Sequence, residues 1–416
     1  MIVLWQVDEI EHATGRNVNQ EKAAAIAQAC MCAMKAIEAL AELGVVDNSD
    51  LIASAQSPKL SRKNKKKQAK LSVHTGIGCG NVNAFHVGGL RSRWEYFVMG
   101  EACSETNIAE GLAGKSETVI SKNCLELLRT HRDDLDITEL EFVRKPHGFA
   151  QLVKFDGDVE NLDNPNANAL CLAPSVISKL HSSLRSYIPA PIVSAVDEGE
   201  NLAGDGVLRE LCVLFIKLTA LDVNMDPKVG LERTGETYQN AVQSIQEAAY
   251  HGRATLRQFI VDDKGAVAIV VVGLPPVTAV KNSSRGLKVA LRILEKGVPA
   301  QIGVTTGTCY CGTIGSSFRG DFAVVGDHIN MAARLMGHAD EGTVLCDDNT
   351  MQAACKDKSL CFSDPKKIRV KGKKSSLVVY IPSRKIYSAM AEVDFLSTQK
   401  SPLVGNAEVW KELQVR

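Results

Sequence analysis

The sequence has no excess of charge of either sign. Its 48 Lys and Arg residues balance 48 Asp and Glu residues, so the formal net charge is zero. A chain without net charge gives no reason to expect nucleic acid or a membrane as its dominant partner. Long apolar runs are also missing. The longest, residues 266–276, is far short of the roughly 20 residues that cross a bilayer, so no membrane span is predicted.

The amino terminus and the cysteines exclude a secreted, disulfide-rich protein. The opening MIVLWQVDEIEH has no basic region before its apolar start and soon turns acidic, unlike a secretory signal. The 12 Cys occur singly apart from Cys30/Cys32 and Cys309/Cys311, and none forms a CxxC pair with His at zinc spacing. Free, buried thiols and a cytosolic location are therefore expected.

What is present is enough apolar sequence for more than one domain, and a repeat. The 416 residues are 45% hydrophobic, which suits a soluble protein with a large core. Residues 73–121 match residues 301–347 in order and spacing. The matched positions are Gly76, Gly80, Tyr96 and Gly100 in the first copy and Gly303, Gly307, Phe322 and Gly326 in the second. An interval of more than two hundred residues indicates two whole domains of similar fold rather than a solenoid.

Each copy has the pattern of a strand, a glycine-containing hairpin, a strand, a helix and a strand. In the second copy further elements precede this pattern: a core strand at 208–222, a helix at 237–252, a hairpin at 257–273 and an amphipathic helix at 283–297. Strands and helices that alternate around one antiparallel-rich sheet predict α+β domains of ferredoxin-like type.

The repeat divides the chain into four segments. We expect a partial first domain at 1–160, a linker at 161–205, a second domain at 206–385 and a tail at 386–416. The opening MIVLW matches a later strand of the second copy, so the first domain is expected to lack its N-terminal strand and helix. A domain without these elements would expose apolar surface, which suggests truncation.

A basic run near 55–70 interrupts the first copy, after a helix predicted at 21–43. We interpret it as a solvated loop, with an acidic partner or a role in localisation as the alternative.

Three other motifs have two interpretations each. The segment AEGLAGKS, residues 109–116, satisfies a relaxed phosphate-loop pattern, but its counterpart in the second copy ends a helix and leads into a strand, the reverse of a phosphate loop. Asp262, Asp263 and Lys264 are read as a hairpin turn, with a metal or phosphate site as the alternative. His74 is either a packed or surface histidine or a contact for a ligand phosphate.

Asn330 and Arg334 are four residues apart, so on a helix they share one face. They are either the solvated side of an ordinary amphipathic helix or a pair that binds one ligand. Their setting favours binding, because a Gly-rich hairpin and an apolar strand ending at Gly326 precede them. Arg is suited to stabilise charge on a transferring phosphoryl group, and Asn can orient a ribose.

The segment FAVVGDHINMAARL, residues 322–335, closely resembles the signature of class III nucleotidyl cyclases. With the two-domain order and the linker, nearly the whole chain is similar to the cyclase region of the soluble, bicarbonate-responsive adenylyl cyclases. In those proteins two cyclase domains precede an ATPase-like module, whose start the tail at 386–416 resembles. The resemblance implies two paired class III cyclase domains in tandem that convert ATP to 3′,5′-cyclic AMP and pyrophosphate.

The same resemblance assigns roles to individual residues. ATP is expected between the paired domains, with Asn330 at the ribose and Arg334 at the reacting phosphate. The base of the nucleotide is expected to contact Arg257, Gln258 and Val324. The terminal phosphates are expected to contact His74. Ala323 takes the position that helps to select the purine, so the preference for ATP follows from the overall resemblance.

Two divalent ions, Mg²⁺ or Mn²⁺, are implied as cofactors, held by two Asp of the first domain. These ligands are expected upstream of Met1, and the second copy has Lys217 and Gly265 at the equivalent positions. The first copy has Ser104 and Ile108 where the second has Asn330 and Arg334, which predicts one live site per pair.

The chain alone is therefore expected to be inactive. The alternatives are a non-catalytic pseudo-cyclase used for dimerisation or nucleotide sensing, and a guanylate cyclase.

Overall fold

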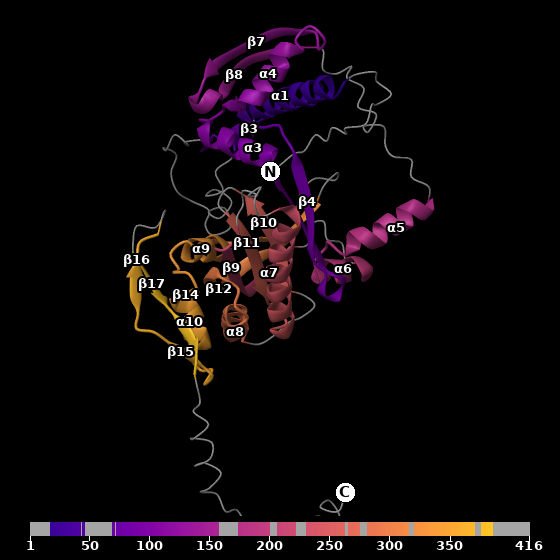
Figure 1. Cartoon of the computed structure of the whole chain (residues 1–416). Coiled ribbons are helices and arrows are strands. Elements are labelled where there is room, and N and C mark those ends of the chain that lie inside the picture. The colour runs from indigo at the N-terminus through magenta and orange to yellow at the C-terminus, as the bar shows by residue number, and fades with distance from the viewer. Residues whose placement is uncertain are drawn as a thin grey trace, which may run out of the picture.

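The computed structural model describes two sheet-containing parts of the chain. The described residues are 17–42, 44–45, 69–70, 72–157, 174–199, 206–221, 230–262, 265–274, 281–315, 320–370 and 376–385. We refer to residues 17–157 as the N-terminal part and to residues 206–385 as the C-terminal part (Figure 1). The predicted opening strand, nearly all of the basic run and the 386–416 tail lie outside the described residues.

The C-terminal part is built on one eight-stranded sheet. Its order is β10-β11-β9-β12-β14-β17-β16, with β13 paired to β12. The strands are β9 (Val207–Leu218), β10 (Thr255–Asp262), β11 (Gly265–Val272), β12 (Ala300–Gly315), β13 (Gly320–Val325), β14 (Thr343–Asp347), β16 (Lys366–Ile368) and β17 (Leu377–Tyr380). Most neighbours are antiparallel, and β12 pairs with β14 in parallel.

The predicted hairpin is the pair β10–β11. Asp262 pairs with Gly265 at its end, and Gly265 has a φ of 117°, which a residue without a Cβ adopts readily. The predicted core strand is β9, and its alternating side chains divide between two faces of the sheet. Cys212, Leu214 and Ile216 belong to one apolar cluster, whereas Leu211 and Val213 belong to another.

Helices cover these two faces differently. On the Cys212 face lie α7 (Leu231–His251) and α8 (Asn282–Glu295), the two helices expected from the sequence. On the Leu211 face lies α9 (Asp327–Met336), whose Ala332 packs in the second cluster. The C-terminal part is completed by α10 (Asp348–Ala354) and by the strand pair β15 (Leu360–Phe362) and β18 (Pro382–Arg384). A mixed α+β fold, as the sequence predicted, is confirmed.

The N-terminal part has a smaller, four-stranded sheet. The order is β3-β6-β8-β7, where β3 is Thr75–Ile77, β6 is Thr118–Ile120, β7 is Ile137–Arg144 and β8 is Ala150–Gly157. Helices α1 (Val18–Glu42), α3 (Glu101–Leu112) and α4 (Lys122–Thr130) accompany it. The short pair β1 (Gly44–Val45) and β2 (Ala69–Lys70) and the 3₁₀ turns η1 (Leu90–Ser92) and η2 (Pro146–Gly148) complete this part.

Helix α1 is more apolar than the sequence analysis recognised. Its residues 18–40 are long and apolar enough, by length and composition, to cross a membrane, and among the described residues this is the one such helix. In the structure its alanine-rich side, including Ala23 and Ala27, packs with Leu125 and Leu128 of α4 in one buried cluster. It thus occupies the place of a core helix of the N-terminal part.

A two-stranded arm joins the two parts. It consists of β4 (Val82–Gly88) and β5 (Trp94–Gly100), which pair with each other alone and extend down to the C-terminal part (Figure 1). Phe85 and Phe97 of the arm belong to the same buried cluster as Tyr238 of α7 and Phe259 of β10. The ring centroids of Phe97 and Tyr238 are 4.8 Å apart. A hydrophobic contact of this kind is the main non-covalent link to be expected between two parts.

Three glutamines of α7 hold the tip of this arm by its backbone. Gln239 Oε1 accepts from Gly88 N at 2.8 Å, and Gln243 Nε2 donates to Gly88 O at 3.0 Å. Gln246 Nε2 donates to Arg93 O at 2.9 Å. Because these glutamines lie at i, i+4 and i+7, they form one stripe along the helix.

The linker also contacts the arm. It forms α5 (Pro174–Arg185) and α6 (Ala190–Asp197), and between them Ser186 O accepts from Trp94 N at 2.9 Å. Tyr187 Oη lies 2.7 Å from His86 Nδ1. The cysteines among the described residues are all free, as predicted, and Cys30, Cys124, Cys212, Cys309, Cys311 and Cys346 are buried.

Candidate functional site

The pair singled out by the sequence lies on α9. This helix begins directly after β13, with Gly326 as its N-cap, and buries Met331, Ala332 and Leu335. Asn330 is exposed and Arg334 is half-buried, on the side that the buried residues leave free. The structure therefore places both polar groups on one accessible helix face, one turn apart.

The position of α9 is fixed by close contact with β12. A Cβ on Gly303 would lie 2.1 Å from Ala332 O and 2.3 Å from Met336 N, so only glycine allows the helix to approach this closely. Thr305 Oγ1 donates to His328 O at 2.7 Å, which ties the first turn of the helix to the same strand. Asn330 and Arg334 thus project from a helix with little freedom to shift.

Neither side chain of the pair is engaged within the described part of the chain. There, Asn330 and Arg334 make no side-chain hydrogen bond and no ion pair. The Arg334 guanidinium offers five donors in a planar fork, and the Asn330 amide offers both donors and an acceptor. All of these groups are available to a ligand without breaking an existing contact.

Two other predicted residues, Arg257 and Gln258, are linked to the strand that carries Val324. Arg257 Nη1 donates to Gln258 Oε1 at 2.8 Å, and Nη2 donates to Phe322 O at 3.2 Å. Phe322 and Val324 both belong to β13, where Val324 is buried and pairs with Cys311. The backbone carbonyl of Phe322 leaves no signal in the pattern of residue types, so this contact was not predictable from the sequence.

The Arg257 side chain is only partly satisfied. Its Nε is buried and has no hydrogen-bond partner among the described residues. Burial lowers the pKa of this guanidinium, and the charge of Asp321 opposes that shift. A desolvated cation with an unused donor is a favourable place for a polar or anionic ligand atom.

His74 lies apart from the other predicted residues. It precedes β3 in the N-terminal part, whereas α9, β10 and β13 belong to the C-terminal part (Figure 1). Its Nε2 is 2.8 Å from Glu110 Oε1. The structure thus brings Arg257, Gln258 and Val324 together next to the strand leading into α9, and it pairs His74 with a carboxylate elsewhere.

In the C-terminal part, the positions equivalent to the expected metal ligands are Lys217 and Gly265, and these residues do not fit a divalent metal ion. Lys217 lies on β9 beside the β10–β11 turn, and its Cε is 3.3 Å from where a Cβ on Gly265 would be. An ammonium group and a glycine supply no oxygen ligand for Mg²⁺ or Mn²⁺. Among the described residues, no group of three or more His, Cys, Asp and Glu is arranged to hold a metal ion.

The phosphate-loop pattern does not have phosphate-loop geometry. Its first residues, from Ala109, finish α3 at Leu112, and β6 begins at Thr118 after a short turn. In a phosphate loop the N-terminus of the following helix faces the phosphate, whereas this segment is followed by a strand and has no such helix N-terminus. The structure agrees with the interpretation drawn from the repeat.

Residues of the C-terminal part match a known protein family. Residues 232–383 match the family described as "Adenylate and Guanylate cyclase catalytic domain". The chain is 25% identical over 356 residues to adenylate cyclase type 10 of Oryctolagus cuniculus, covering 80% of this chain and 22% of that protein. It is 22% identical over 298 residues to adenylate cyclase type 10 of Homo sapiens, covering 67% of this chain and 18% of that protein. The chain thus spans about a fifth of the length of these relatives.

The solved structures that resemble part of this chain include the adenylyl cyclase CyaB from P. aeruginosa. The match has 19% sequence identity and a TM-score of 0.39, and it covers 44% of this chain and 97% of that structure.

Proposed function

We propose that this chain contributes one half of an adenylate cyclase site, because residues 232–383 match the adenylate and guanylate cyclase catalytic domain. The reaction is the conversion of ATP to 3′,5′-cyclic AMP and pyrophosphate in intracellular signalling, in the cytoplasm. The similarity to adenylate cyclase type 10 over most of the chain supports ATP as the substrate. Pairing of the two parts within one chain would create the second half.

In this reaction the ribose 3′-oxygen attacks the α-phosphorus. A new P–O bond closes the cyclic diester, the bond from the α-phosphorus to the pyrophosphate oxygen breaks, and the hydroxyl proton is lost. Asn330 would orient the ribose so that its 3′-oxygen faces the phosphorus. Arg334 would stabilise the charge that builds up on the phosphoryl oxygens.

One observation carries this proposal. Asn330 and Arg334 are two polar residues of a helix that is packed tightly on β12, and within the described residues their side chains have no partner. Rigid placement with unused donors is what binding of a transition state requires, because the site then pays no reorganisation cost.

The remaining residues would contact the ends of the nucleotide. We assign Arg257, Gln258 and Val324 to the base, since the first two are linked to the strand of the third. His74 would meet the terminal phosphates only after the two parts approach each other more closely and its contact with Glu110 is broken. Its role is therefore the most demanding of these assignments.

Divalent ions, when bound, would activate the 3′-hydroxyl and neutralise phosphate charge. Lys217 and Gly265 do not fit them, so no metal-dependent step is assigned to the described residues. The same observation favours a second candidate function, in which the chain senses a nucleotide or promotes dimerisation without catalysis. Guanylate cyclase is the third possibility, because Ala323 carries no polar group that would select a purine.

Nucleotide binding tests the proposal directly. We expect the chain to bind ATP in isothermal titration calorimetry, and Arg334→Ala to weaken binding about ten- to a hundredfold, as for loss of a charged hydrogen bond. Arg144→Ala, at an exposed arginine on β7 of the N-terminal part, is the matched control and should have no effect. Unchanged affinity in Arg334→Ala would refute the assignment.

Two further arms separate the candidate functions. Tighter binding of GTP than of ATP would favour guanylate cyclase as the function. With ATP and Mn²⁺, we expect this chain to make no measurable cyclic AMP, and robust product would show that our view of the metal ligands is wrong.

A further inference from the structure

A charged cavity lies in the C-terminal part, on the sheet face opposite α9. It has a volume of about 420 Å³ and is formed by the end of α7, the turn into β10, the outer side of α8 and the end of β18. The residues that line it are Ala248, His251, Gly252, Arg253, Arg285, Lys288, Val289, Arg292 and Arg384. Five of the nine are Lys or Arg, one is His, and none is an acid.

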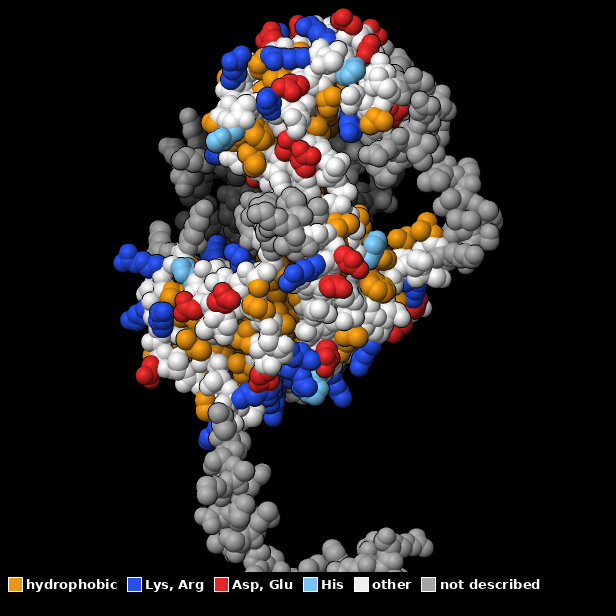
Figure 2. Space-filling model, viewed as in Figure 1, with side chains coloured by type: hydrophobic (Ala, Val, Ile, Leu, Met, Phe, Trp, Pro, Cys, Tyr) orange, Lys and Arg blue, Asp and Glu red, His pale blue; other side chains and the backbone are white. Residues whose placement is uncertain are grey.

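The sequence of α8 produces this surface. Leu287, Ala290 and Ile293 are fully buried against the sheet. Arg285, Lys288 and Arg292 lie at i, i+3 and i+7, so the same helix presents three cations on its other side. In Figure 2, Lys and Arg side chains gather at the lower end of the C-terminal part, where Figure 1 shows α8.

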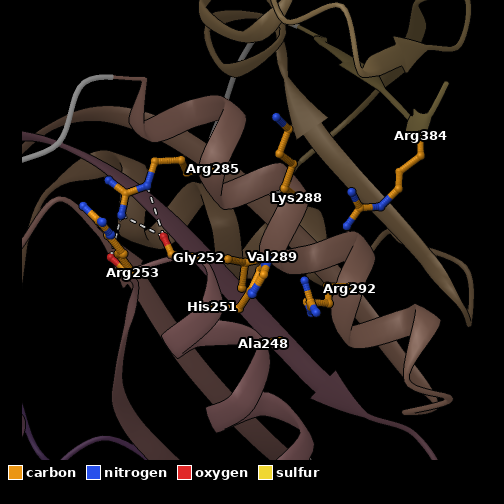
Figure 3. A pocket seen from close by; sticks show the side chains of 9 residues that line it. All are labelled: Ala248, His251, Gly252, Arg253, Arg285, Lys288, Val289, Arg292 and Arg384. Atoms are coloured by element: carbon orange, nitrogen blue, oxygen red, sulfur yellow. Dashed lines mark hydrogen bonds between the residues drawn. The ribbon is translucent and has the colours of Figure 1, made fainter. Parts of the chain in front are cut away.

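The cations surround the cavity from several elements. Figure 3 shows Arg384 reaching from its strand toward Arg292 on α8, while Arg253 and Arg285 lie at the opposite end. Such an arrangement separates positive groups around a space instead of spreading them along one exposed helix. Like charges at this density repel one another, and an anion between them would relieve the repulsion.

Nearby acids neutralise only part of this charge. Lys288 Nζ is 2.7 Å from Asp357 Oδ2, and Arg384 forms an ion pair with Glu295. Within the described residues, Arg253 and Arg292 have no carboxylate within ion-pair distance. Glu247 lies near Arg292 but is itself paired with Lys296 at 2.6 Å. The cavity therefore keeps an excess of positive charge.

Arg285 adds an unsatisfied donor. It donates from Nε and Nη2 to Gly252 O, at 3.1 and 2.7 Å, and from Nη2 to Arg253 O at 2.7 Å. Its Nη1 is buried without a partner among the described residues. Burial lowers the pKa of this guanidinium, and the charge of Arg253 lowers it further. A buried donor without an acceptor is costly unless a ligand supplies one.

The cavity is separate from the nucleotide site proposed above. Leu287 of α8 packs on the sheet face of Cys212 and Leu214, whereas Ala332 of α9 packs on the face of Leu211 and Val213. The whole thickness of the sheet therefore lies between Arg292 and Arg334. A ligand at one site would not touch the other.

We propose that this cavity binds a small anion with two or more phosphate groups. Arginine forks match phosphate oxygens in a bidentate manner, and four of the lining residues are arginines on three different elements. The volume lies within the range of small-molecule sites, and several separated guanidinium groups favour a ligand with several charged groups over a single anion. Such phosphates occur free in solution or on a lipid headgroup.

The test measures binding of inorganic tripolyphosphate and inositol hexakisphosphate by calorimetry at 150 mM salt. Vesicles with and without a phosphoinositide form a third arm, which distinguishes a lipid source from a free one. The variant is Arg253→Glu with Arg292→Glu, since neither side chain has a structural hydrogen bond in the described part. The control is Lys366→Glu with Lys367→Glu, which makes the same change in net charge on exposed β16.

We expect saturable binding that weakens at least tenfold in Arg253→Glu/Arg292→Glu and less than twofold in the control. Thermal melts should show that both variants fold. Arg334→Ala should keep this binding while losing ATP affinity, so the two proposals fail independently. The inference is overturned if no probe binds the unaltered chain, or if the control variant loses as much affinity as the cavity variant.

Discussion

The two hairpin–helix units of this chain share one local plan and differ in their tertiary partners. Each has a strand, a hairpin that ends in glycine, and a helix that returns over the strand. A Cβ on Gly76 would lie 2.5 Å from Thr106 O and 2.4 Å from Glu110 N, and the corresponding distances for Gly303 are 2.1 Å to Ala332 O and 2.3 Å to Met336 N. The repeat in the sequence thus corresponds to the same strand–helix contact in three dimensions.

The hairpins themselves diverge. In the second unit β12 runs without interruption from its sheet into the hairpin with β13. In the first unit β3 ends at Ile77, and the arm leaves its own sheet to pack on α7 and β10. Phe97, which enters that foreign core, corresponds to Ala323 in the second unit. Two hairpins with the same local sequence pattern therefore take different positions, because each packs against different tertiary partners.

The helices diverge as well. At the positions of Asn330 and Arg334, α3 has Ser104 and Ile108. Ser104 Oγ donates to Gly100 O of its own first turn at 3.2 Å, and Ile108 is 49% exposed. Neither offers a guanidinium or an amide to a nucleotide. One unit has the groups for a ligand, and the other has an arm that holds the two parts together.

The largest effect is expected from glycine replacement at the strand–helix contact. Gly303→Ala should lower the free energy of unfolding by about 4 kcal/mol or more, because two backbone atoms block the new methyl group. Any folded Gly303→Ala protein should also lose ATP binding, whereas Gly76→Ala should destabilise the N-terminal part and leave ATP binding intact. Urea denaturation and calorimetry measure both quantities.

The helical Gly111 supplies the control, since a Cβ there meets nothing within 4 Å. Gly111→Ala should be neutral or slightly stabilising. Equal loss of ATP binding in Gly76→Ala and Gly303→Ala would contradict the proposal that ATP binds to the second unit and not to the first.

Removing the aromatic ring of Phe97 in the arm is expected to have the next largest effect on stability. Phe97→Ala leaves a cavity among Phe85, Tyr238 and Phe259, and the free energy of unfolding should fall by about 3 kcal/mol. Limited proteolysis should then cut the arm faster than in the unaltered chain. Val82→Ala, at a half-exposed position of the same arm, should cost less than about 1 kcal/mol. Similar losses for Val82→Ala and Phe97→Ala would contradict the docked position of the arm.

A smaller effect concerns pH. Burial raises the pKa of Glu95 from its ordinary 4.5 to about 7, and the charge of Arg93 opposes the shift. The two groups approach to 2.8 Å without the angles of a hydrogen bond. Since the folded state holds this proton more tightly, stability should decrease as the pH rises from about 4.5 to about 7.

Glu95→Gln should remove roughly 1–3 kcal/mol of that pH dependence. Thermal melts from pH 4 to 8 measure it, with the exposed Glu141→Gln as the control. A slope that survives in Glu95→Gln would assign the titration to another group. The position matching Glu95 in the second unit is Asp321, which is exposed.

Local features were predictable from the sequence because they depend on neighbours along the chain. The β10–β11 hairpin, the helix α8 and the shared glycines follow from turn chemistry, helix periodicity and the repeat. The spacing of Asn330 and Arg334 likewise placed them on one helix face before any coordinates were considered. The structure added that α9 is pinned to β12 and that the two side chains are unengaged.

Features set by distant partners were not predictable. Nothing in residues 82–100 says that the arm will dock on Tyr238, because the same alternating pattern in the second unit stays within its own sheet. The charged side of α8 reads as ordinary solvated surface until Arg253 and Arg384 are placed opposite it. The domain boundaries, the roles of the site residues and the pairing of the two domains remain predictions.

The grip of the three glutamines on the arm has a consequence for evolution and for ionic strength. Gln239, Gln243 and Gln246 bind main-chain atoms of Gly88 and Arg93, and a Cβ on Gly88 would lie 2.5 Å from Gln246 Nε2, so the joint requires glycine at position 88. Because the amides are neutral, added salt does not screen them as it screens ion pairs. The hydrogen bonds between the arm and α7 should therefore keep their strength as the salt concentration rises, whereas anion binding in the cavity on α8 should weaken.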